Sequence, residues 1–339
     1  MKPAAKVSAF DRASLFEQTY EALLHHVLGF LGSKWTFTTW RALSVTFPSN
    51  VATLSRDRLG MPGGSRVKVT TAVILAAGTG TRMRQADVSA ALTSQQQSMA
   101  ESGNKTLIPF ERPFLDYSLG ALADAGFKRI CLVVSPNQDD LVAHCQELET
   151  ARLKIELAVQ HEPRGTADAV LAAEPAIGNE SEFAVLNGDN YYSVEVLKAL
   201  RALERPGLVA FDRAGLLARG ESNLSRERMA RFAIVQVDSA GHLTGILEKP
   251  DSATYASLPE PVLVSLNCWR FSPSIFRACE RIPESERGEL ELTAAVQYSI
   301  DELGESFKVS TSTSPVLDLS ERADITAVAS HLEGLELDL

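Results

Sequence analysis

The chain has 339 residues, of which 45% are hydrophobic and 22% charged, a balance typical of a folded domain with a sizeable core. The formal net charge of −10 argues against general nucleic-acid binding, and no apolar run reaches the roughly 18 residues of a membrane helix. The N-terminus also lacks the order of a signal peptide. We therefore expect a cytoplasmic protein without nucleic-acid or membrane partners, either a monomer or a homo-oligomer. Its four cysteines form no CxxC pair and are expected to be buried free thiols.

Residues 1–69 differ in composition from the rest of the chain. They begin with an amphipathic pattern over Arg12–Leu31 and continue from Ser33 with many Ser, Thr, Arg, Gly and Pro residues. We interpret this part as an N-terminal extension that is loosely ordered or partly helical. A second hypothesis is that Met61 is the natural start. The folded domain is expected to span residues 70–335.

From residue 70 short apolar runs alternate with helical patterns. Strands are predicted at Thr70–Ala76, Arg129–Ser135, Lys154–Gln160, Phe183–Leu186 and Gly207–Phe211. Helices are predicted at Leu115–Ala125, Asp139–Glu149, Thr166–Ala173 and Val194–Leu203. Nearly continuous apolar strands separated by helices indicate a mainly parallel sheet covered on both faces. Ligands bind such sheets beyond the carboxyl ends of the strands.

The pattern changes near residue 232. Phe232–Val237 and His242–Glu248 predict an antiparallel hairpin, and Val262–Phe271 predicts a further strand. The remaining predicted helices are Pro273–Arg281, Leu290–Glu302 and Glu321–Leu332. The expected fold class is α/β: a three-layer α/β/α Rossmann-like fold with a mainly parallel mixed sheet and a smaller antiparallel subregion on the substrate side.

The first predicted strand leads directly into a glycine-rich loop, Leu75-Ala-Ala-Gly-Thr-Gly-Thr-Arg-Met83. Gly78 and Gly80 permit a sharp turn and close approach to a ligand, and successive N–H groups can surround phosphate oxygens. Arg82 adds a bidentate donor that suits phosphate. The third glycine of the dinucleotide pattern GxGxxG and the Walker A spacing are both missing. The loop therefore predicts phosphate binding of another kind, with a plain strand-to-loop turn as the alternative.

The segment AAGxGTRM resembles the sugar-nucleotide pyrophosphorylase family of nucleotidyltransferases, and further matches follow in order from Val69 to Leu332. The resemblance implies a nucleotidyltransferase fold and Mg²⁺-dependent transfer from an NTP to a sugar 1-phosphate, giving an NDP-sugar and pyrophosphate. By position, the nucleotide-binding residues would be Leu75, Ala76, Ala77, Gly78, Thr79, Gly80, Thr81, Arg82, Lys105, Gln160, Gly165, Thr166, Asn187 and Gly188.

Lys105, in Gly103-Asn-Lys-Thr-Leu-Ile-Pro109, resembles the family's lysine that contacts the triphosphate. It follows Arg82 at about twice the family's interval, because Arg84–Ser102 is a polar insertion. We interpret the insertion as a mobile lid or an extended loop.

The segment Gln160-His-Glu-Pro-Arg-Gly-Thr-Ala167 resembles the family's Q-x-E-P-x-G-T-A sequence. The Gln160 amide offers donors and an acceptor to a nucleobase edge, and Gly165 permits close backbone approach. Thr166 is equally well placed to cap the helix that follows.

Two aspartates are candidates for the Mg²⁺ site. Asp189, in Leu186-Asn-Gly-Asp-Asn190, follows an apolar strand and resembles the family's L-x-G-D-N. Carboxylate oxygens at a strand end, facing a triphosphate, are suitable ligands for Mg²⁺. Asp318 is the candidate for the second carboxylate, although the Trp and Gly of the family's W-x-D-x-G are absent there.

The acceptor site is predicted from four residues: Asn190, Glu248, Lys249 and Asn267. Glu248-Lys249-Pro250 matches the family's EKP, in which the lysine would bind the acceptor phosphate and the glutamate the sugar hydroxyls. Asn267 lies on the sugar-side strand, where Asn-Cys-Trp replaces the family's usual pattern. The segment Gly288-Glu-Leu-Glu-Leu-Thr293 resembles the helix opening near the same pocket, with a capped surface helix as an equal explanation.

The resemblance implies in-line attack of the acceptor phosphate on the α-phosphorus of the NTP, with Arg82, Lys105, Asp189 and Lys249 as the catalytic set. Such a reaction needs alignment and charge neutralisation more than a protein base. One alternative is a cytidylyltransferase that acts on a non-sugar phosphate or phosphonate. Another is a regulatory nucleotide-binding module without turnover.

Overall fold

The structure is a computed structural model that describes residues 68–339 except 88–89 and 221. The predictions for residues 1–67, including the Arg12–Leu31 helix and Met61, lie outside the described residues. The strands are β1 (Thr71–Leu75), β2 (Arg129–Val134), β3 (Lys154–Val159), β4 (Phe183–Asn187), β5 (Asn190–Tyr192), β6 (Gly207–Asp212), β7 (Ala233–Val237), β8 (Leu243–Leu247), β9 (Leu263–Ser265), β10 (Trp269–Phe271), β11 (Lys308–Ser312) and β12 (Val316–Asp318).

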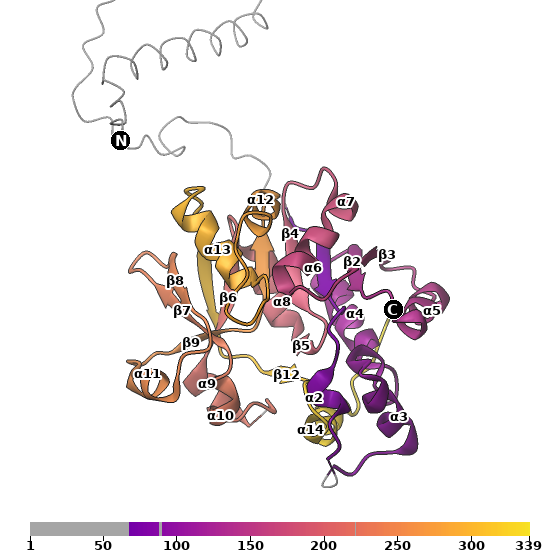
Figure 1. Ribbon diagram of the computed structural model, residues 1–339. Helices are drawn as coiled ribbons and strands as arrows, with labels where there is room; N and C mark the ends of the chain where they lie inside the picture. The colour runs from indigo at the N-terminus through magenta and orange to yellow at the C-terminus, as the bar shows by residue number, and fades with distance from the viewer. Residues whose placement is uncertain (1–67, 88–89, 221) are drawn as a thin grey trace, which may run out of the picture. The chain divides into compact units, whose positions relative to one another are not determined.

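Two of the helices are short. α2 (Thr81–Arg84) follows the glycine loop, and the 3₁₀ turn η2 (Lys105–Leu107) begins at Lys105. The others are α3 (Ser94–Ser102), α4 (Phe114–Ala125), α5 (Asp139–Glu147), α6 (Thr166–Ala172), α7 (Glu174–Ile177), α8 (Val194–Ala202), α9 (Arg213–Arg219), α10 (Arg226–Met229), α11 (Ser252–Ser257), α12 (Ser274–Cys279), α13 (Leu292–Asp301) and α14 (Ala323–Leu332). Figure 1 shows them around a central sheet.

Within the described residues, ten strands form one sheet in the order β3-β2-β1-β4-β10-β6-β9-β7-β8, with β11 beside β6. β1 is parallel to both β2 and β4, and β2 is parallel to β3. β10 runs antiparallel between β4 and β6, and the β7–β8 hairpin is antiparallel. The predicted mixed sheet with an antiparallel substrate-side region is confirmed.

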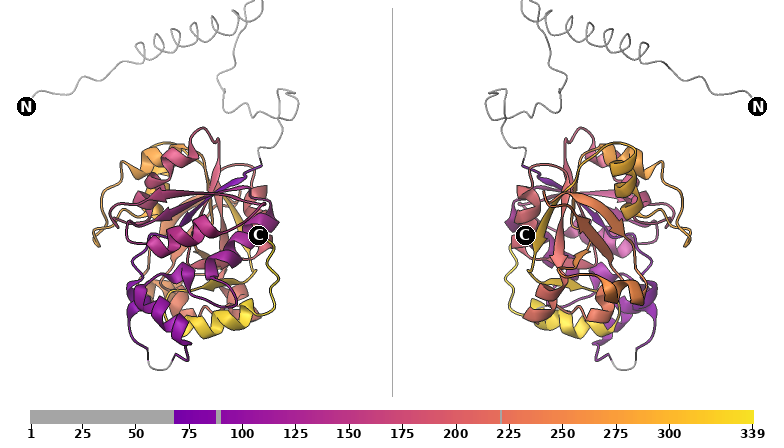
Figure 2. Two further views of the ribbon diagram at one scale, coloured as in Figure 1. Left: turned by 90° about the vertical axis from the view of Figure 1, so that its right-hand side faces the viewer. Right: turned by 90° about the vertical axis from the view of Figure 1, so that its left-hand side faces the viewer.

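Helices cover both faces of the sheet (Figure 2). The reason is the alternation of side chains along buried strands. In β1, Ala72 and Ile74 pack in one core with leucines of α4, whereas Val73 packs in a second core with α6, α12 and α13. These two cores are the two interfaces of a three-layer α/β/α architecture.

The prediction of one strand over Val262–Phe271 is wrong. β9 ends at Ser265 and β10 begins at Trp269, because Asn267 between them adopts the left-handed region with φ 55°. Asparagine tolerates this conformation better than most side chains. The break lies at the cavity described below.

The interpretation of Arg84–Ser102 as a lid or extended loop is wrong for its second half. Residues 94–102 form α3, whose capping box joins Thr93 to Gln96. The Gln96 amide donates to the Pro109 carbonyl at 2.9 Å, and Ala100 is fully buried. The insertion is therefore a docked helix at this end.

The C-terminal part of the chain returns to the glycine loop. β12 pairs antiparallel with β5, so that Asp318 lies opposite Asn190. Apolar side chains of α14, including Ile325 and Val328, share a small core with Met83 of α2. The segment from β12 to α14 thus contacts both β5, which follows Asp189, and α2, which follows the glycine loop.

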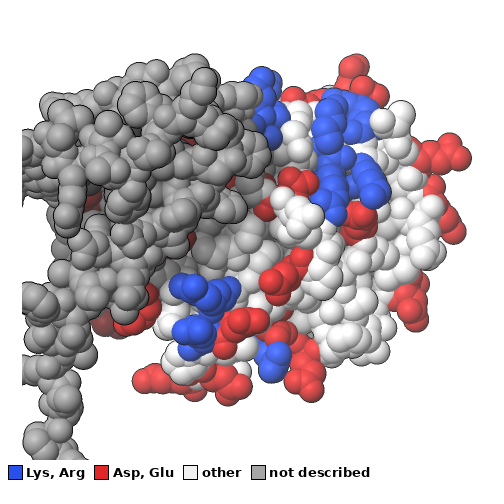
Figure 3. All heavy atoms as spheres, turned by 90° about the horizontal axis from the view of Figure 1, so that it is seen from above, with Lys and Arg blue, Asp and Glu red and all other residues white. Residues whose placement is uncertain are grey.

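Acidic and basic side chains are interspersed on the face of the molecule shown in Figure 3. One local network is formed by Arg129, whose guanidinium contacts Glu156 at 2.6 Å and Glu180 at 3.3 Å. No helix among the described residues is long and apolar enough to cross a membrane.

Candidate functional site

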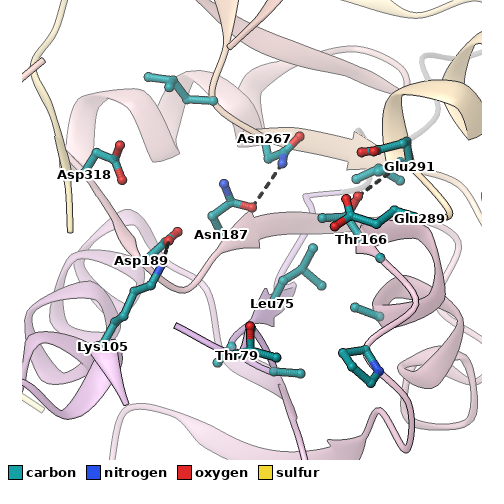
Figure 4. A pocket seen from close by; sticks show the side chains of 18 of the residues that line it. Leu75, Thr79, Lys105, Thr166, Asn187, Asp189, Asn267, Glu289, Glu291 and Asp318 are labelled. Atoms are coloured by element: carbon teal, nitrogen blue, oxygen red, sulfur yellow. Dashed lines mark hydrogen bonds and ion pairs between the residues drawn. The ribbon is translucent and has the colours of Figure 1, made fainter. Parts of the chain in front are cut away.

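A cavity of about 730 Å³ lies at the carboxyl ends of β1 and β4 and extends to the end of β8. Among its lining residues are these members of the predicted site: Leu75, Ala76, Ala77, Gly78, Thr79, Arg82, Lys105, Gln160, Gly165, Thr166, Asn187, Asp189, Glu248, Lys249, Asn267 and Asp318. Figure 4 shows Lys105, Asp189 and Asp318 on one side of it and Glu289 and Glu291 on the other. Gly80, Thr81, Gly188 and Asn190 were predicted for the site but do not line the cavity.

The two glycines of the loop have different roles. A β-carbon on Gly78 would meet no atom within 4 Å, so this backbone faces open space in the cavity. Gly80 has φ 65°, and a β-carbon there would overlap the backbone of Gly103. Gly80 is therefore required where the loop docks on the segment that carries Lys105, whereas Gly78 leaves room for a ligand.

Gly188 acts through packing in the same way. Its N–H donates to the Leu75 carbonyl at 2.9 Å, and a β-carbon on it would lie 2.9 Å from that oxygen. The close contact holds the end of β4 against the end of β1. Asp189, the next residue, is thereby placed beside the glycine loop.

Lys105 and Asp189 form an ion pair within the cavity, with 2.7 Å between Nζ and Oδ2. Burial favours the neutral form of Asp189, but the charges of Lys105 and Arg82 outweigh it and hold the pKa of this carboxyl below its usual range. The site thus contains an ionised carboxylate that is stabilised by two cationic side chains.

Asp318 approaches Asp189 through the pairing of β12 with β5 and through the Leu319 N–H, which donates to the Asp189 carbonyl at 2.8 Å. Its carboxylate accepts hydrogen bonds from Arg228 and from the Ser320 hydroxyl. Burial and the negative charge of Asp189 raise the pKa of Asp318 to about 6, with Arg228 acting in the opposite direction. The two carboxylates are close enough to affect each other.

The Gln160 amide is less available than expected. Its Nε2 donates to the Gly165 carbonyl at 3.0 Å and to Asp168 Oδ2 at 2.9 Å. Both partners are acceptors, so the amide orientation follows from the network. The prediction that its donors face a nucleobase is wrong, and the Oε1 acceptor is the group that remains for a ligand.

Thr166 does not cap its own helix, contrary to one of the two roles considered for it. Its hydroxyl accepts a hydrogen bond of 2.9 Å from the backbone N–H of Leu292, which is the first residue of α13. Gly165 fits the same junction, because φ is 120° there and a β-carbon would overlap the Leu290 backbone. Segments more than a hundred residues apart in the chain are joined at this edge of the cavity.

The acceptor side has two parts. Glu248 accepts a hydrogen bond from Thr293 at 3.0 Å, and burial raises its pKa. Lys249 has φ 40° and a half-exposed side chain, with Nζ 3.8 Å from Glu248 Oε1. A cation and a carboxylate therefore face the cavity at the end of β8.

A chain of amides forms the second part. Trp269 Nε1 donates to Asn267, which donates to Asn187, which donates to Asn190. Asn190 is 2% exposed and ends this chain inside the protein. Its prediction as an acceptor ligand is wrong for this structure, because its side chain supports Asn187 instead.

The family model described as nucleotidyl transferase matches residues 71–314. The chain belongs to this family. It is 30% identical over 234 residues to a glucose-1-phosphate thymidylyltransferase of Streptomyces griseus, covering 68% of this chain and 57% of the relative. It is 26% identical to the UTP–glucose-1-phosphate uridylyltransferase AglF of Haloferax volcanii, covering 68% and 83%. The matched part is thus less than two thirds of the length of the first of these relatives.

Solved structures show the same nucleotidyltransferase fold. A UDP-glucose pyrophosphorylase complexed with UDP-glucose superposes with a TM-score of 0.60 at 16% identity, over 77% of this chain and 97% of that one. An inositol-1-phosphate CTP transferase from T. maritima has a TM-score of 0.59 at 18% identity, over 80% and 100%.

Sequence reasoning missed several lining residues of this nucleotidyl transferase, notably Arg228, Arg231 and Gln138. Gln138 Nε2 donates to the Ala76 carbonyl at 2.9 Å and to Asn104 Oδ1 at 3.1 Å, which ties the Lys105 segment to the glycine loop. No local signal marks this glutamine. The arginines had one, because three of them occur within residues 226–231 of a chain whose net charge is −10.

The donor set is compatible with Mg²⁺. Asp189 and Asp318 supply hard oxygens from adjacent segments, and no group of three or more His, Cys, Asp or Glu residues suited to a metal occurs in the described part of the chain. Mg²⁺ in nucleotide sites is commonly held by one or two carboxylates together with substrate phosphates. Asp189 and Asp318, beside the glycine loop, provide two such carboxylates.

Proposed function

We propose that this chain catalyses Mg²⁺-dependent nucleotidyl transfer from an NTP to a sugar 1-phosphate, giving an NDP-sugar and pyrophosphate. The observation that carries the proposal is the Lys105–Asp189 pair, which lies in one cavity with both the glycine loop and Lys249. Family membership and the relatives that act on glucose 1-phosphate support it.

Each part of the cavity has a place in this reaction. Gly78 and Arg82 would bind the β- and γ-phosphates, and Lys105 would offset charge at the α-phosphate. Lys249 would hold the acceptor phosphate, one of whose oxygens bonds to the α-phosphorus as the bond to pyrophosphate breaks. The attacking oxygen is already anionic, so alignment rather than proton removal is the main requirement.

Mg²⁺, bound by Asp189 with Asp318 as the second carboxylate, would supply further neutralisation of the phosphate charge. The ionised state of Asp189 supports its part in this binding, since its pKa is lowered. The mutual effect of the two carboxylates supports it as well, because a bound divalent cation would offset their negative charges.

We propose UTP or dTTP as the nucleotide. The Oε1 acceptor of Gln160 suits a base edge with an N–H donor, which uracil and thymine present at N3. Two of the relatives are a thymidylyltransferase and a uridylyltransferase. A cytidylyltransferase acting on a non-sugar phosphate is the second candidate, favoured by the Asn267-Cys268-Trp269 departure and by the fold of the inositol-1-phosphate CTP transferase.

The test is pyrophosphate release from the full chain, measured with Mg²⁺ over UTP, dTTP, CTP, ATP and GTP against several phosphorylated acceptors. Release with UTP or dTTP and a sugar 1-phosphate is expected. Release only with CTP and a non-sugar acceptor would establish the second candidate, and no release with any pair would favour a binding module without turnover.

Asp189→Asn gives the matching site test. It removes one charge without changing volume, and kcat should fall by about 100-fold or more, as expected for loss of a major charge-stabilising group. Circular dichroism should show an unchanged fold. An unchanged turnover would remove Asp189 from the proposed metal site.

A further inference from the structure

Arg228 is a buried arginine at the edge of the cavity, on the short helix α10. Its Nε and Nη2 lie 3.0 Å and 2.8 Å from the same oxygen of Asp318, Oδ2. Its guanidinium also contacts both carboxylate oxygens of Asp324 at the start of α14. One side chain therefore joins the α10 segment to the candidate metal carboxylate and to the C-terminal helix.

The hydrogen bonds of Asp318 can be counted. The two carboxylate oxygens together have about four acceptor positions. Arg228 Nε donates a hydrogen bond to Oδ2, where Nη2 also lies 2.8 Å away in an ion pair, and the Ser320 hydroxyl donates to Oδ1 at 2.8 Å. The guanidinium therefore covers Oδ2, whereas Oδ1 carries a single hydrogen bond among these interactions.

We propose that Arg228 is a positioning residue that orients Asp318 so that it binds the divalent cation through a single oxygen, Oδ1. The inference rests on the proposed Mg²⁺ site of Asp189 and Asp318. Arg228 itself does not touch the cation. It acts as outer-shell partners of metal ligands do, by holding the ligand in one orientation.

The competing explanation is that Arg228 only links α10 to α14 through Asp324. Asp324 already accepts the N–H groups of Ser320 and Glu321 at 2.9 Å and 2.7 Å. If the role were only structural, removal of Arg228 would lower stability and leave the metal affinity of the folded protein unchanged. If Arg228 orients Asp318, metal affinity falls in protein that is still folded.

The experiment measures Mn²⁺ binding to the full chain by electron paramagnetic resonance, in the presence of a non-hydrolysable UTP analogue. Arg228→Met should weaken Mn²⁺ binding by about tenfold or more, in the range found for outer-shell partners. Arg228→Lys, which keeps the charge but loses the two-donor geometry, should fall between Arg228→Met and wild type. Arg226→Met, at an exposed position on the same helix, is the control and should bind like wild type.

A folded Arg228→Met protein with wild-type Mn²⁺ affinity would overturn the inference. If that variant does not fold, Ser320→Ala removes the other hydrogen bond to the carboxylate and should weaken Mn²⁺ binding by a smaller factor; unchanged binding in both Ser320→Ala and Arg228→Lys would equally overturn it. Asp189→Asn separates the two proposals. If Asp189→Asn binds Mn²⁺ like wild type, the proposed metal site itself is wrong. If Asp189→Asn loses Mn²⁺ binding but Arg228→Met does not, only the role of Arg228 is contradicted.

Discussion

Burial determines the reactivity of the four thiols. It raises the pKa of Cys131 and Cys145 to about 11 and that of Cys279 to about 12, and it raises the pKa of Cys268 further. A raised pKa means that the thiol stays protonated at pH 8, and the thiolate is the reactive form. We expect that none of the four thiols of the native protein reacts with a thiol reagent such as DTNB at pH 8. All four should react in protein unfolded in guanidinium. Rapid reaction of one thiol in the native protein would contradict this.

The close contact between Gly80 and the Gly103 backbone gives a second prediction at the level of single residues. Gly80→Ala should lower the free energy of unfolding by about 1–2 kcal/mol from left-handed strain alone, and the overlap with Gly103 should displace the loop as well. Steady-state kinetics should then show an NTP KM raised by about tenfold or more. Gly220→Ala is the control, because Gly220 lies in the same left-handed region, with φ 63° and ψ 9°, and a β-carbon there would meet no atom within 4 Å. It should show the strain without the kinetic effect. Equal NTP KM values in the two variants would exclude the docking role of Gly80.

At the level of secondary structure, the junction between α6 and α13 depends on one hydroxyl. Thr166→Val keeps the shape of the side chain but leaves the Leu292 N–H without its acceptor, so the free energy of unfolding should fall by about 1 kcal/mol. Urea denaturation measures it. Thr166→Ser retains the hydroxyl and should lose less. If the valine variant is as stable as wild type, the hydrogen bond does not hold this junction.

Sequence patterns predicted the elements whose signals are local. The apolar runs that became β1, β2, β4 and β6 were found because largely buried strands are apolar at nearly every position. β3, at the edge of the sheet, is mostly not buried and was found from its Ile, Leu and Val at alternate positions. The capping box of α3 was also present in the sequence, but the polar composition of the insertion concealed it. The break at Asn267 could not be predicted, because it depends on a backbone conformation that asparagine adopts only where its surroundings favour it.

In the candidate site, too, features with a local sequence signal could be predicted and features that depend on tertiary contacts could not. Most lining residues could be predicted because they are consecutive in a few short segments, such as Leu75–Thr79. What could not be predicted is how side chains satisfy one another across the chain. The Gln160 amide donates to Asp168, and the Asn190 amide oxygen accepts from Asn187. One oxygen of the Asp318 carboxylate accepts from Arg228. Such pairings belong to tertiary structure, and no spacing in the sequence reveals them.

At the level of the whole molecule, the C-terminal segment is tied to the glycine loop through Arg322. Its buried guanidinium donates to the carbonyls of Met83 at 3.0 Å and Arg84 at 3.3 Å, the last residues of α2. Arg322→Met would leave both carbonyls without these donors, at a cost of about 1–3 kcal/mol in the free energy of unfolding. The variant should also raise the KM for the NTP and leave the KM for the acceptor unchanged, because we propose that the glycine loop binds the nucleotide.

Thermal unfolding together with initial-rate kinetics for each substrate measures both effects. Arg322→Lys restores one donor and should recover part of the stability. A rise confined to the acceptor KM would show that the C-terminal segment supports the other half of the cavity.

The position of β12 has a consequence for biosynthesis. Strand β4 and Asp189 are made early, and the sheet can begin to pair while β6 and its neighbours leave the ribosome. Asp318 and Arg322 are made more than a hundred positions after the residues that they contact, Asn190 and Met83. A nascent chain can thus pair β1, β2, β3 and β4 before it has a complete cavity, because Asp318 and the last strand of the sheet, β11, are both made much later.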